Sequence, residues 1–237
     1  MNKPMYQRVL LKLSGEGLSG DDSAIDGSIL QRLALDIKKA VCQGVSFGLV
    51  VGGGNFWRGA KGTSHIERVT GDYIGMIATT MNALALRDAL NAVGVKAVVQ
   101  SALPIKGVVG AFCRIKARFL MRRGVVVIFA GGTGKPYFTT DTCAVLRAVQ
   151  TKCDACLKST QVDGIYDSDP RKNKKAKKYD VVSYRQALDE KLGVMDLSAI
   201  EMAQKNKMPV VVFNQSKEGS LLDVLCGKGV CSTMKDI

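Results

Sequence analysis

Three features of this sequence could bind a phosphate or another anion. Lys12 lies at the end of the apolar run of residues 9–13, where a lysine needs water or an anionic partner. Residues 52–54 are three glycines, whose backbone N–H groups can approach an anion closely at the start of a helix. Arg58 follows them and offers a planar fork that suits phosphate oxygens. Taken alone, the glycine triplet is equally typical of a tight strand-to-helix turn.

Two further strand-like runs are followed by segments of the same character. Residues 125–129 lead into residues 131–141, which are rich in glycine and threonine and end at Asp141. Residues 156–158 lead into residues 159–166, which begin with two hydroxyl side chains. In an open parallel sheet, ligands bind beyond the carboxyl ends of the strands. We therefore expect four loop segments to meet at one sheet edge and to form the site.

Several other chemistries are excluded by the same residues. Gly134 and Lys135 suggest a Walker P-loop, but that motif needs Gly where this chain has Phe129 and Ser or Thr where it has Pro136. The dinucleotide fingerprint G-x-G-x-x-G is absent as well. The one histidine, His65, lies in a polar loop, so a histidine-based triad is not expected. Phosphoryl transfer to an acceptor that is itself a phosphate would need no such base, because the second pKa of a phosphate monoester is about 6.

The elements that must position these residues alternate between strands and helices. We expect strands over residues 8–13, 45–51, 96–100, 125–129, 156–158 and 209–213. We expect helices over residues 26–43, 71–93, 112–123, 141–151, 183–191 and 196–206. Because the strands are apolar on both faces, this alternation favours an α/β fold with a mostly parallel sheet covered by helices. No linker or repeat interrupts it, so we expect residues 1–237 to form a single domain.

The helix over residues 112–123 is expected to be amphipathic. Phe112, Ile115 and Phe119 would face inward on one stripe, with Arg114, Arg118 and Arg122 among the residues facing outward. The longest apolar run, residues 125–132, is far shorter than the roughly 20 residues that span a bilayer, and residues 1–13 do not resemble a signal peptide. We therefore expect a cytoplasmic protein that does not enter a membrane.

The formal net charge of +13 could indicate nucleic acid or another anionic partner. Residues 171–178 carry six positive charges and residues 113–123 carry five, with no acidic residue in either segment. The remainder of the chain is nearly balanced. Neither segment has the aromatic interleaving that is typical of single-strand binding, and a solvated surface is the simpler explanation. Nucleic-acid binding therefore remains a secondary alternative.

The seven cysteines indicate free thiols rather than disulfides. Cys153 and Cys156 have the spacing of a metal or redox pair, and Cys226 with Cys231 could complete a zinc site. The first pair opens an apolar strand, and the second pair is spaced five residues apart. Buried structural thiols are therefore the favoured interpretation, and no side chain is predicted to be a metal ligand.

These residues together carry a family resemblance. The chain resembles the bacterial uridylate kinases (UMP kinases), a branch of the amino acid kinase family, from about Tyr6 to the C-terminus. The matching segments are residues 11–16, 52–59, 71–76, 81–88, 132–141, 162–170 and 194–197. The first two are shared with relatives that act on carbamate, aspartate or glutamate. The segments 71–76, 81–88 and 136–141 are typical of the UMP branch.

The resemblance implies a fold, an activity and a set of site residues. The fold would be a three-layer αβα sandwich of the amino acid kinase (carbamate kinase-like) type, and the enzyme would transfer the γ-phosphoryl group of ATP to UMP. The residues implied in ATP binding are Lys12, Leu13, Ser14, Gly15, Gly54, Arg58, Thr160, Tyr166 and Asp169. Those implied in UMP binding are Gly53, Asp72, Thr133, Gly134, Lys135, Pro136, Tyr137, Phe138, Thr139 and Thr140. Catalytic roles are implied for Lys12, Arg58, Asp141 and Asp196, with Asp196 orienting Lys12 and Asp141 organising the reacting groups.

The resemblance also implies partners and regulation. It implies Mg²⁺ bound with ATP, a homohexamer, activation by GTP, feedback inhibition by UTP and a place in pyrimidine nucleotide (UTP and CTP) synthesis. Two departures from the family pattern stand out: Lys135 replaces the usual Asn, and residues 20–24, in the region linked with GTP activation, form a short loop without the usual glycines. The alternatives are another amino acid kinase relative acting on a carboxylate or carbamate, and a basic nucleic-acid-binding protein.

Overall fold

The computed structural model describes residues 3–57, 65–216 and 218–237. Its β-strands are β1 (Arg8–Leu13), β2 (Ser46–Val51), β3 (Ala97–Ser101), β4 (Gly110–Ala111), β5 (Val126–Ala130), β6 (Ala155–Thr160), β7 (Ile165–Tyr166), β8 (Lys178–Tyr179), β9 (Val181–Ser183), β10 (Val210–Asn214) and β11 (Cys231–Lys235). Its helices are the 3-10 turn η1 (Gly15–Leu18), α1 (Gly27–Cys42), α2 (Arg68–Ala92), α3 (Arg114–Arg122), α4 (Thr140–Thr151), α5 (Tyr184–Asp189), α6 (Leu197–Lys205) and α7 (Ser220–Leu225).

One nine-stranded sheet runs through the described residues in the order β4-β3-β5-β2-β1-β6-β10-β11-β9. All neighbouring strands pair in parallel except β10 and β11, which pair antiparallel. The strands β7 and β8 form a separate antiparallel hairpin. The predicted α/β fold with a mostly parallel sheet is therefore confirmed. The predicted strands are also present, with ends shifted by one or two residues.

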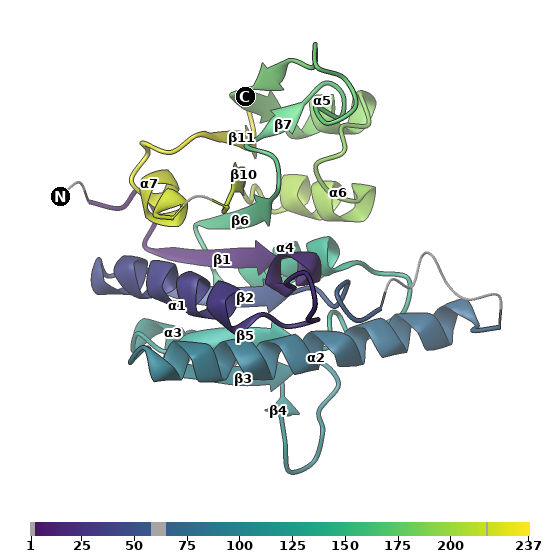
Figure 1. Ribbon diagram of the computed structural model, residues 1–237. Helices are drawn as coiled ribbons and strands as arrows, with labels where there is room; N and C mark the ends of the chain where they lie inside the picture. The colour runs from purple at the N-terminus through teal and green to yellow at the C-terminus, as the bar shows by residue number, and fades with distance from the viewer. Residues whose placement is uncertain (1–2, 58–64, 217) are drawn as a thin grey trace.

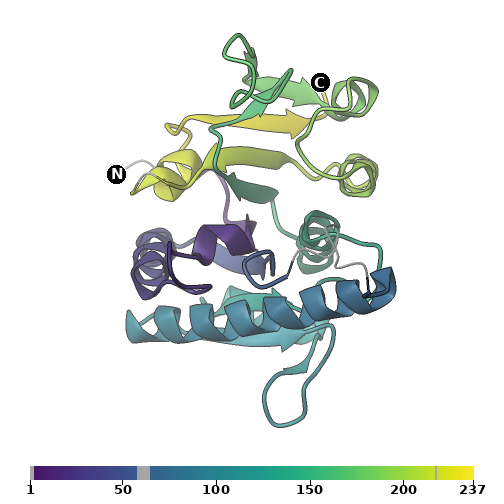
Figure 2. The ribbon, with the colours of Figure 1, turned by 45° about the vertical axis from the view of Figure 1, so that its right-hand side comes forward.

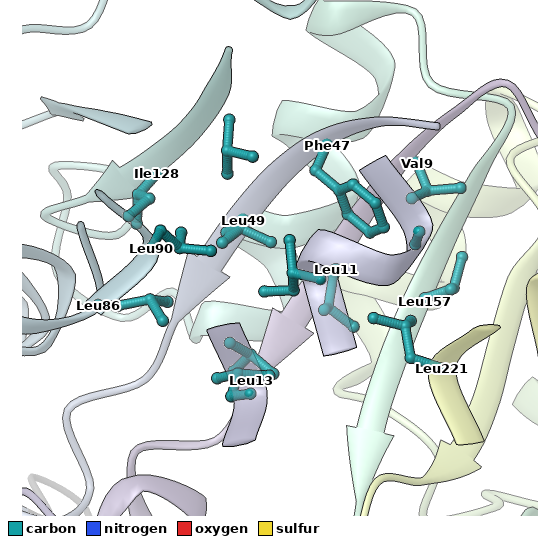
Figure 3. Packing of buried hydrophobic residues seen from close by; sticks show 14 of the residues in the cluster. Val9, Leu11, Leu13, Phe47, Leu49, Leu86, Leu90, Ile128, Leu157 and Leu221 are labelled. Carbon is teal, nitrogen blue, oxygen red and sulfur yellow. The ribbon is translucent and has the colours of Figure 1, made fainter. Parts of the chain in front are cut away.

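Helices cover both faces of the sheet, which gives the expected three layers (Figures 1 and 2). On one face, α1, α2 and α7 bury an apolar cluster that includes Leu11, Phe47 and Leu221 (Figure 3). On the other face, α3, α4, α5 and α6 bury a second cluster that includes Phe129 and Tyr184. Because strands buried on both faces need apolar residues at successive positions, the run Val9 to Leu11 is wholly buried.

The helix caps explain why several helices begin where they do. The Asp26 carboxylate accepts hydrogen bonds from the N–H groups of Ser28 and Ile29, at 2.8 and 3.0 Å, and starts α1. Thr139 caps α4 in the same way, through the N–H of Asp141 at 3.0 Å. The carboxylate of Asp196 accepts the N–H of Ala199 at 3.0 Å and starts α6. Two of these three caps lie beside the predicted site.

The prediction for residues 112–123 was wrong in part. In α3 the buried side chains are Ala117 and Met121, one turn apart, whereas Ile115 and Phe119 are exposed. The small Ala117 side chain lets the helix approach the sheet closely, which turns Ile115 and Phe119 toward solvent. The guanidinium of Arg123 then lies 4.6 Å from the centroid of the Phe119 ring.

The basic segment of residues 171–178 and the cysteine pair Cys153 and Cys156 have defined places in the structure. Of the basic residues 171–178, residues 171–177 lie in the connection between β7 and β8, and Lys178 begins β8. Cys153 and Cys156 carry buried thiols that form no disulfide. Burial raises the pKa of Cys153 to about 12, and it raises the pKa of Cys156 as well, so neither is a reactive thiolate. No described helix is long and apolar enough to cross a membrane.

Candidate active site

The centre of the candidate site is a buried cluster of two lysines and one aspartate. Lys12 on β1 and Lys158 on β6 lie side by side in the parallel register, so their side chains leave the same face of the sheet. The Asp141 carboxylate, in the first turn of α4, lies 3.1 Å from the Lys12 ammonium and 2.6 Å from the Lys158 ammonium. All three side chains are no more than 14% exposed. We call these three residues the Lys–Asp–Lys cluster.

Burial and charge act against each other in this cluster. Burial acts to raise the pKa of the Asp141 carboxyl, but the ammonium groups of Lys12 and Lys158 hold it below its ordinary value. Burial lowers the pKa of the Lys158 ammonium, against the opposing effect of Asp141. With both lysines charged and Asp141 ionised, the cluster carries one net positive charge. It can therefore attract an anion without further ionisation.

Lys158 is the member that the sequence reasoning missed. Lys158 follows the apolar residues 155–157 of β6, just as Lys12 follows the apolar residues 9–11 of β1. The sequence therefore marks both lysines in the same way, as a charged residue at the end of an apolar strand. A lysine at the carboxyl end of a buried strand needs a charged or polar partner. In the structure, the Lys158 ammonium donates to the Asp141 carboxylate and also to the Val194 carbonyl.

Asp196 does not orient Lys12, contrary to our expectation. Its carboxylate accepts the Thr139 hydroxyl at 2.5 Å and the Thr142 hydroxyl at 2.8 Å, besides capping α6. The Lys12 ammonium pairs with Asp141 instead. Because Thr139 caps α4, Asp196 ties the first turn of α4 to the first turn of α6. Its contacts are those of a residue that positions Asp141 from the next helix.

A cavity of about 140 Å³ is lined by residues of the glycine turn, of α2 and of the segment that leads into α4. Of the residues predicted to bind UMP, Gly53, Asp72, Phe138, Thr139 and Thr140 line it, and Thr133, Gly134, Lys135, Pro136 and Tyr137 do not. The residues of its lining that were not predicted are Trp57, Gly71, Gly75, Met76, Thr79 and Gly132. We call it the α2 cavity, because α2 supplies most of these additions.

Two glycines of α2 line the α2 cavity and face the Trp57 indole. Gly71 and Gly75 lie one turn apart, and a Cβ at either would stand 3.5 to 3.7 Å from the Trp57 indole. The indole therefore packs on this bare strip of helix. At these distances an added Cβ would make only an ordinary van der Waals contact with the indole.

The segment of residues 133–140 is fastened to α2 through Asp72. The Asp72 carboxylate accepts the Tyr137 N–H at 2.8 Å and the Arg68 Nε at 3.0 Å. Tyr137 has a φ of +69°, which a tyrosine rarely adopts without a fixed partner. On the far side of the cavity, the Thr79 hydroxyl accepts the Gly131 N–H at 2.8 Å. Nothing in the sequence distinguished Thr79 from an ordinary core threonine.

A second cavity, of about 110 Å³, opens on the α1 face of the sheet. Among the residues predicted to bind ATP, Leu13, Ser14 and Thr160 line it. The unpredicted lining includes Arg32, Asp36, Gln161, Gln215 and Ser216. We call it the α1 cavity. Leu13 and Ser14 directly follow Lys12, and Thr139 and Thr140 directly precede Asp141, so each lining begins next to the cluster along the chain, although no cluster residue lines either cavity.

The other predicted ATP residues lie outside this lining. Gly15 packs so tightly against the glycine turn that a Cβ there would stand 2.6 Å from the Gly54 nitrogen. The Tyr166 hydroxyl donates to Asp163 at 2.6 Å, and Asp169 pairs with Arg171 at 3.2 Å, both near the β7–β8 hairpin. Arg58, a predicted catalytic residue, lies outside the described residues.

The chain is similar to known proteins in both sequence and fold. A profile described as the amino acid kinase family matches residues 7–214. The chain is 48% identical over 236 residues to the uridylate kinase of Brucella abortus biovar 1 (strain 9-941), covering 99% of this chain and 98% of that protein. The crystal structure of UMP kinase from Ureaplasma parvum superposes with a TM-score of 0.92 at 37% identity, over 97% of this chain and 99% of that one. UMP kinase from Bacillus anthracis gives 0.94 at 34% identity, over 98% and 96%.

Proposed function

The chain belongs to the amino acid kinase family, and we propose that it transfers the γ-phosphoryl group of ATP to UMP, giving ADP and UDP. The observation that carries this proposal is the buried Lys–Asp–Lys cluster, whose members directly adjoin, along the chain, residues that line the two cavities. Half of the residues predicted to bind UMP line the α2 cavity, and three of those predicted to bind ATP line the α1 cavity. We assign each residue of the site its own role in the phosphoryl transfer.

The acceptor needs no base from the protein. A nucleoside monophosphate is largely dianionic at neutral pH, because its second pKa is about 6. Two anions must therefore be brought together and aligned, and their repulsion must be neutralised. Lys12 and Lys158 supply two fixed ammonium groups toward the carboxyl ends of β1 and β6, and Asp141 holds them in place. Such preorganised charge stabilises the negative charge on the phosphoryl oxygens without reorganisation during the reaction.

Asp72 is proposed to position UMP in the α2 cavity, directly and through the Tyr137 N–H. We expect Asp72→Ala to raise the KM for UMP about tenfold or more, because a charged acceptor is lost from the cavity. The KM for ATP should change by less than about twofold. Steady-state kinetics with each substrate varied would measure both. Asp88→Ala is a matched control, since Asp88 lies on the same helix, is exposed and pairs with its neighbour Arg87. An unchanged UMP requirement in Asp72→Ala would refute the assignment.

Mg²⁺ is proposed to arrive with ATP and to neutralise charge on its β- and γ-phosphate oxygens. The described residues contain no group of three or more His, Cys, Asp or Glu side chains that could hold a metal ion. The carboxylate at the reaction centre, Asp141, is engaged by two lysines. This donor set suits an ion that keeps its phosphate and water ligands, as Mg²⁺ commonly does.

We also propose that the chain forms a homohexamer. The family resemblance supplies the number of subunits, and an apolar stripe on α2 supports self-association. Tyr73, Ile77 and Met81 recur at every fourth position of α2 and are all exposed. A stripe of this kind on a long surface helix marks a contact site.

Ile77→Glu is expected to break the assembly, because the glutamate would be buried without a partner in the subunit contact. Light scattering should then give a smaller species than the wild-type hexamer. Leu35→Glu, at an exposed apolar residue of a different helix, α1, is the control. A wild-type protein that is monomeric at micromolar concentration would contradict the proposal.

The remaining proposals rest on the resemblance together with the activity. UDP is a precursor of UTP and CTP, so we place the reaction in pyrimidine nucleotide synthesis. We further propose a cytoplasmic location, GTP activation and UTP inhibition. We treat residues 1–237 as one domain, because a single sheet joins all the described strands except the β7–β8 hairpin.

An ADP-release assay across a panel of acceptors tests the proposed activity. The panel contains UMP, CMP, dUMP, aspartate, acetylglutamate and carbamate, each with and without GTP. We expect turnover with UMP to exceed that with every carboxylate or carbamate. Turnover of a carboxylate with none of UMP would establish another amino acid kinase activity instead. A steeply salt-dependent shift of RNA or DNA in a gel, without kinase activity, would favour the nucleic-acid alternative.

A further inference from the structure

Two asparagines far apart in the sequence, one buried and one half-buried, form an amide pair beside the glycine turn. Asn82 lies in the middle of α2 and is fully buried, and Asn55 directly follows Gly54. The Asn55 Nδ2 donates to the Asn82 Oδ1 at 2.9 Å, and the Asn82 Nδ2 donates to the Asn55 Oδ1 at 2.8 Å. The two amides are therefore joined by reciprocal hydrogen bonds.

Two backbone carbonyls complete the pair and fix its orientation. The Asn82 Nδ2 donates to the Gly52 carbonyl at 2.7 Å, and the Asn55 Nδ2 donates to the Ala24 carbonyl at 2.6 Å. Only an amide nitrogen can face a carbonyl oxygen at these distances, so neither amide can be flipped. All four amide hydrogens are used. A fully satisfied buried polar network of this kind holds its backbone partners in one conformation.

The backbone that this pair holds serves both halves of the candidate site. A Cβ on Gly15 would stand 2.6 Å from the Asn55 Oδ1 and 2.9 Å from the Gly52 carbonyl, so η1 rests on the pair. A Cβ on Gly53 would stand 2.7 Å from the Gly75 carbonyl, so the turn also presses on α2. Gly53 lines the α2 cavity, and Gly15 and Gly54 are proposed to contact ATP.

We propose that Asn82 and Asn55 are positioning residues that set the glycine turn between the two nucleotides. This inference rests on the proposed function, because it assigns the turn to UMP on one side and ATP on the other. Neither amide lines either cavity. They act through the Gly52 carbonyl and through the contact with Gly15. A displacement of about 1 Å at a reacting group can reduce turnover about a hundredfold, so a loosened turn affects catalysis strongly.

The test separates positioning from structural support by measuring UMP affinity as well as turnover. The probe is the fluorescence of Trp57, the one tryptophan of the chain, which lines the α2 cavity. In Asn82→Ala we expect the Kd for UMP to rise at least about fivefold and kcat to fall at least about tenfold. A merely structural role would lower the melting temperature and the active fraction, and would leave the Kd of the folded fraction unchanged.

Two more variants and a control complete the experiment. Asn55→Ala leaves the bond from Asn82 to Gly52 in place and should show the same changes to a smaller degree, which keeps the inference testable if Asn82→Ala fails to fold. The double variant should be no worse than Asn82→Ala, because residues that act as a unit are not additive. Asn91→Ala removes a comparable amide bond, to the Ala97 N–H, from the same helix and should leave the UMP Kd and kcat unchanged.

The outcomes distinguish this inference from the proposed function. If the wild type phosphorylates UMP and both single variants keep its Kd and kcat, the positioning role is refuted and the proposed function stands. If the wild type neither binds nor phosphorylates UMP, the proposed function fails. Independent, multiplicative losses in the double variant would also overturn the idea that the amides act as a pair.

Discussion

Lys12→Ala is expected to lower kcat by about a hundredfold to a thousandfold while the protein remains folded. Lys12 supplies one of the two ammonium groups of the cluster, and removing one preorganised charge or donor from a reaction centre has an effect of this size. The fold should survive because Asp141 retains its ion pair with Lys158 at 2.6 Å. Steady-state kinetics and circular dichroism on the same preparation would check both parts.

Two further variants make the Lys12 prediction specific. Lys12→Met keeps most of the buried stem and removes the charge, so it should be as inactive as Lys12→Ala if charge is what matters. Lys96→Ala is the matched control, because Lys96 precedes β3 at the opposite edge of the sheet and is exposed. Near-normal kcat in both Lys12 variants would show that this lysine takes no part in the reaction.

Asp141→Asn is expected to be the most damaging single change, because it affects stability as well as turnover. The substitution leaves two nearly buried lysines facing each other without a negative charge. Removing one partner of a buried ion pair costs about 3–5 kcal/mol. Urea denaturation should therefore show a loss of about this size, together with loss of UMP phosphorylation. Asp189→Asn, which breaks an exposed pair with Arg185, should cost less than about 1 kcal/mol.

The pH dependence of the stability loss in Asp141→Asn distinguishes a charge effect from a packing defect, because only the charge effect changes with pH. In the folded variant, burial and the facing Lys12 favour the neutral form of Lys158, so the pKa of Lys158 lies below its ordinary value of about 10.4. Below that lowered pKa, Lys158 is charged in the folded variant and destabilises it to the full extent. This destabilisation decreases as the pH rises from the lowered pKa of the folded state to the ordinary pKa of the unfolded state. The stability gap between wild type and Asp141→Asn should therefore be widest near neutral pH and narrow as the pH rises toward the ordinary lysine pKa of about 10.4. A gap that does not change over this range would contradict the charge argument.

Much of the fold could be predicted because burial leaves a simple pattern in the central strands. The runs that became β1, β2, β5 and β10 are apolar on successive residues, and helices with clear stripes lie between them. The outer elements were not predicted. The strand β9 has three residues and β7 has two, which is too short for an apolar period to show. Ile115 and Phe119 were wrongly predicted to face the core. The apolar stripe of residues 112–119 does not show that the small residue Ala117 is the one that lets α3 approach the sheet.

The site was predictable where a residue is chemically out of place. Lys12 could be identified because an ammonium group at the end of an apolar strand needs a partner, and Lys158 carries the same signal. The partner itself could not be found in this way, since the choice between Asp141 and Asp196 depends on how α4 and α6 pack. Thr79 and the amide of Asn82 were missed because a polar side chain inside a helix gives no sign of the backbone group that it will meet.

The most direct test of the central proposal follows the phosphoryl group itself. The protein is incubated with UMP, Mg²⁺ and ATP that carries a radioactive γ-phosphate, and the products are separated by chromatography. The proposed function predicts that the label appears in the β-phosphate of UDP, in amounts equal to the ADP formed. Release of the label as inorganic phosphate at the same rate with and without UMP would contradict it, because the protein would then be hydrolysing ATP.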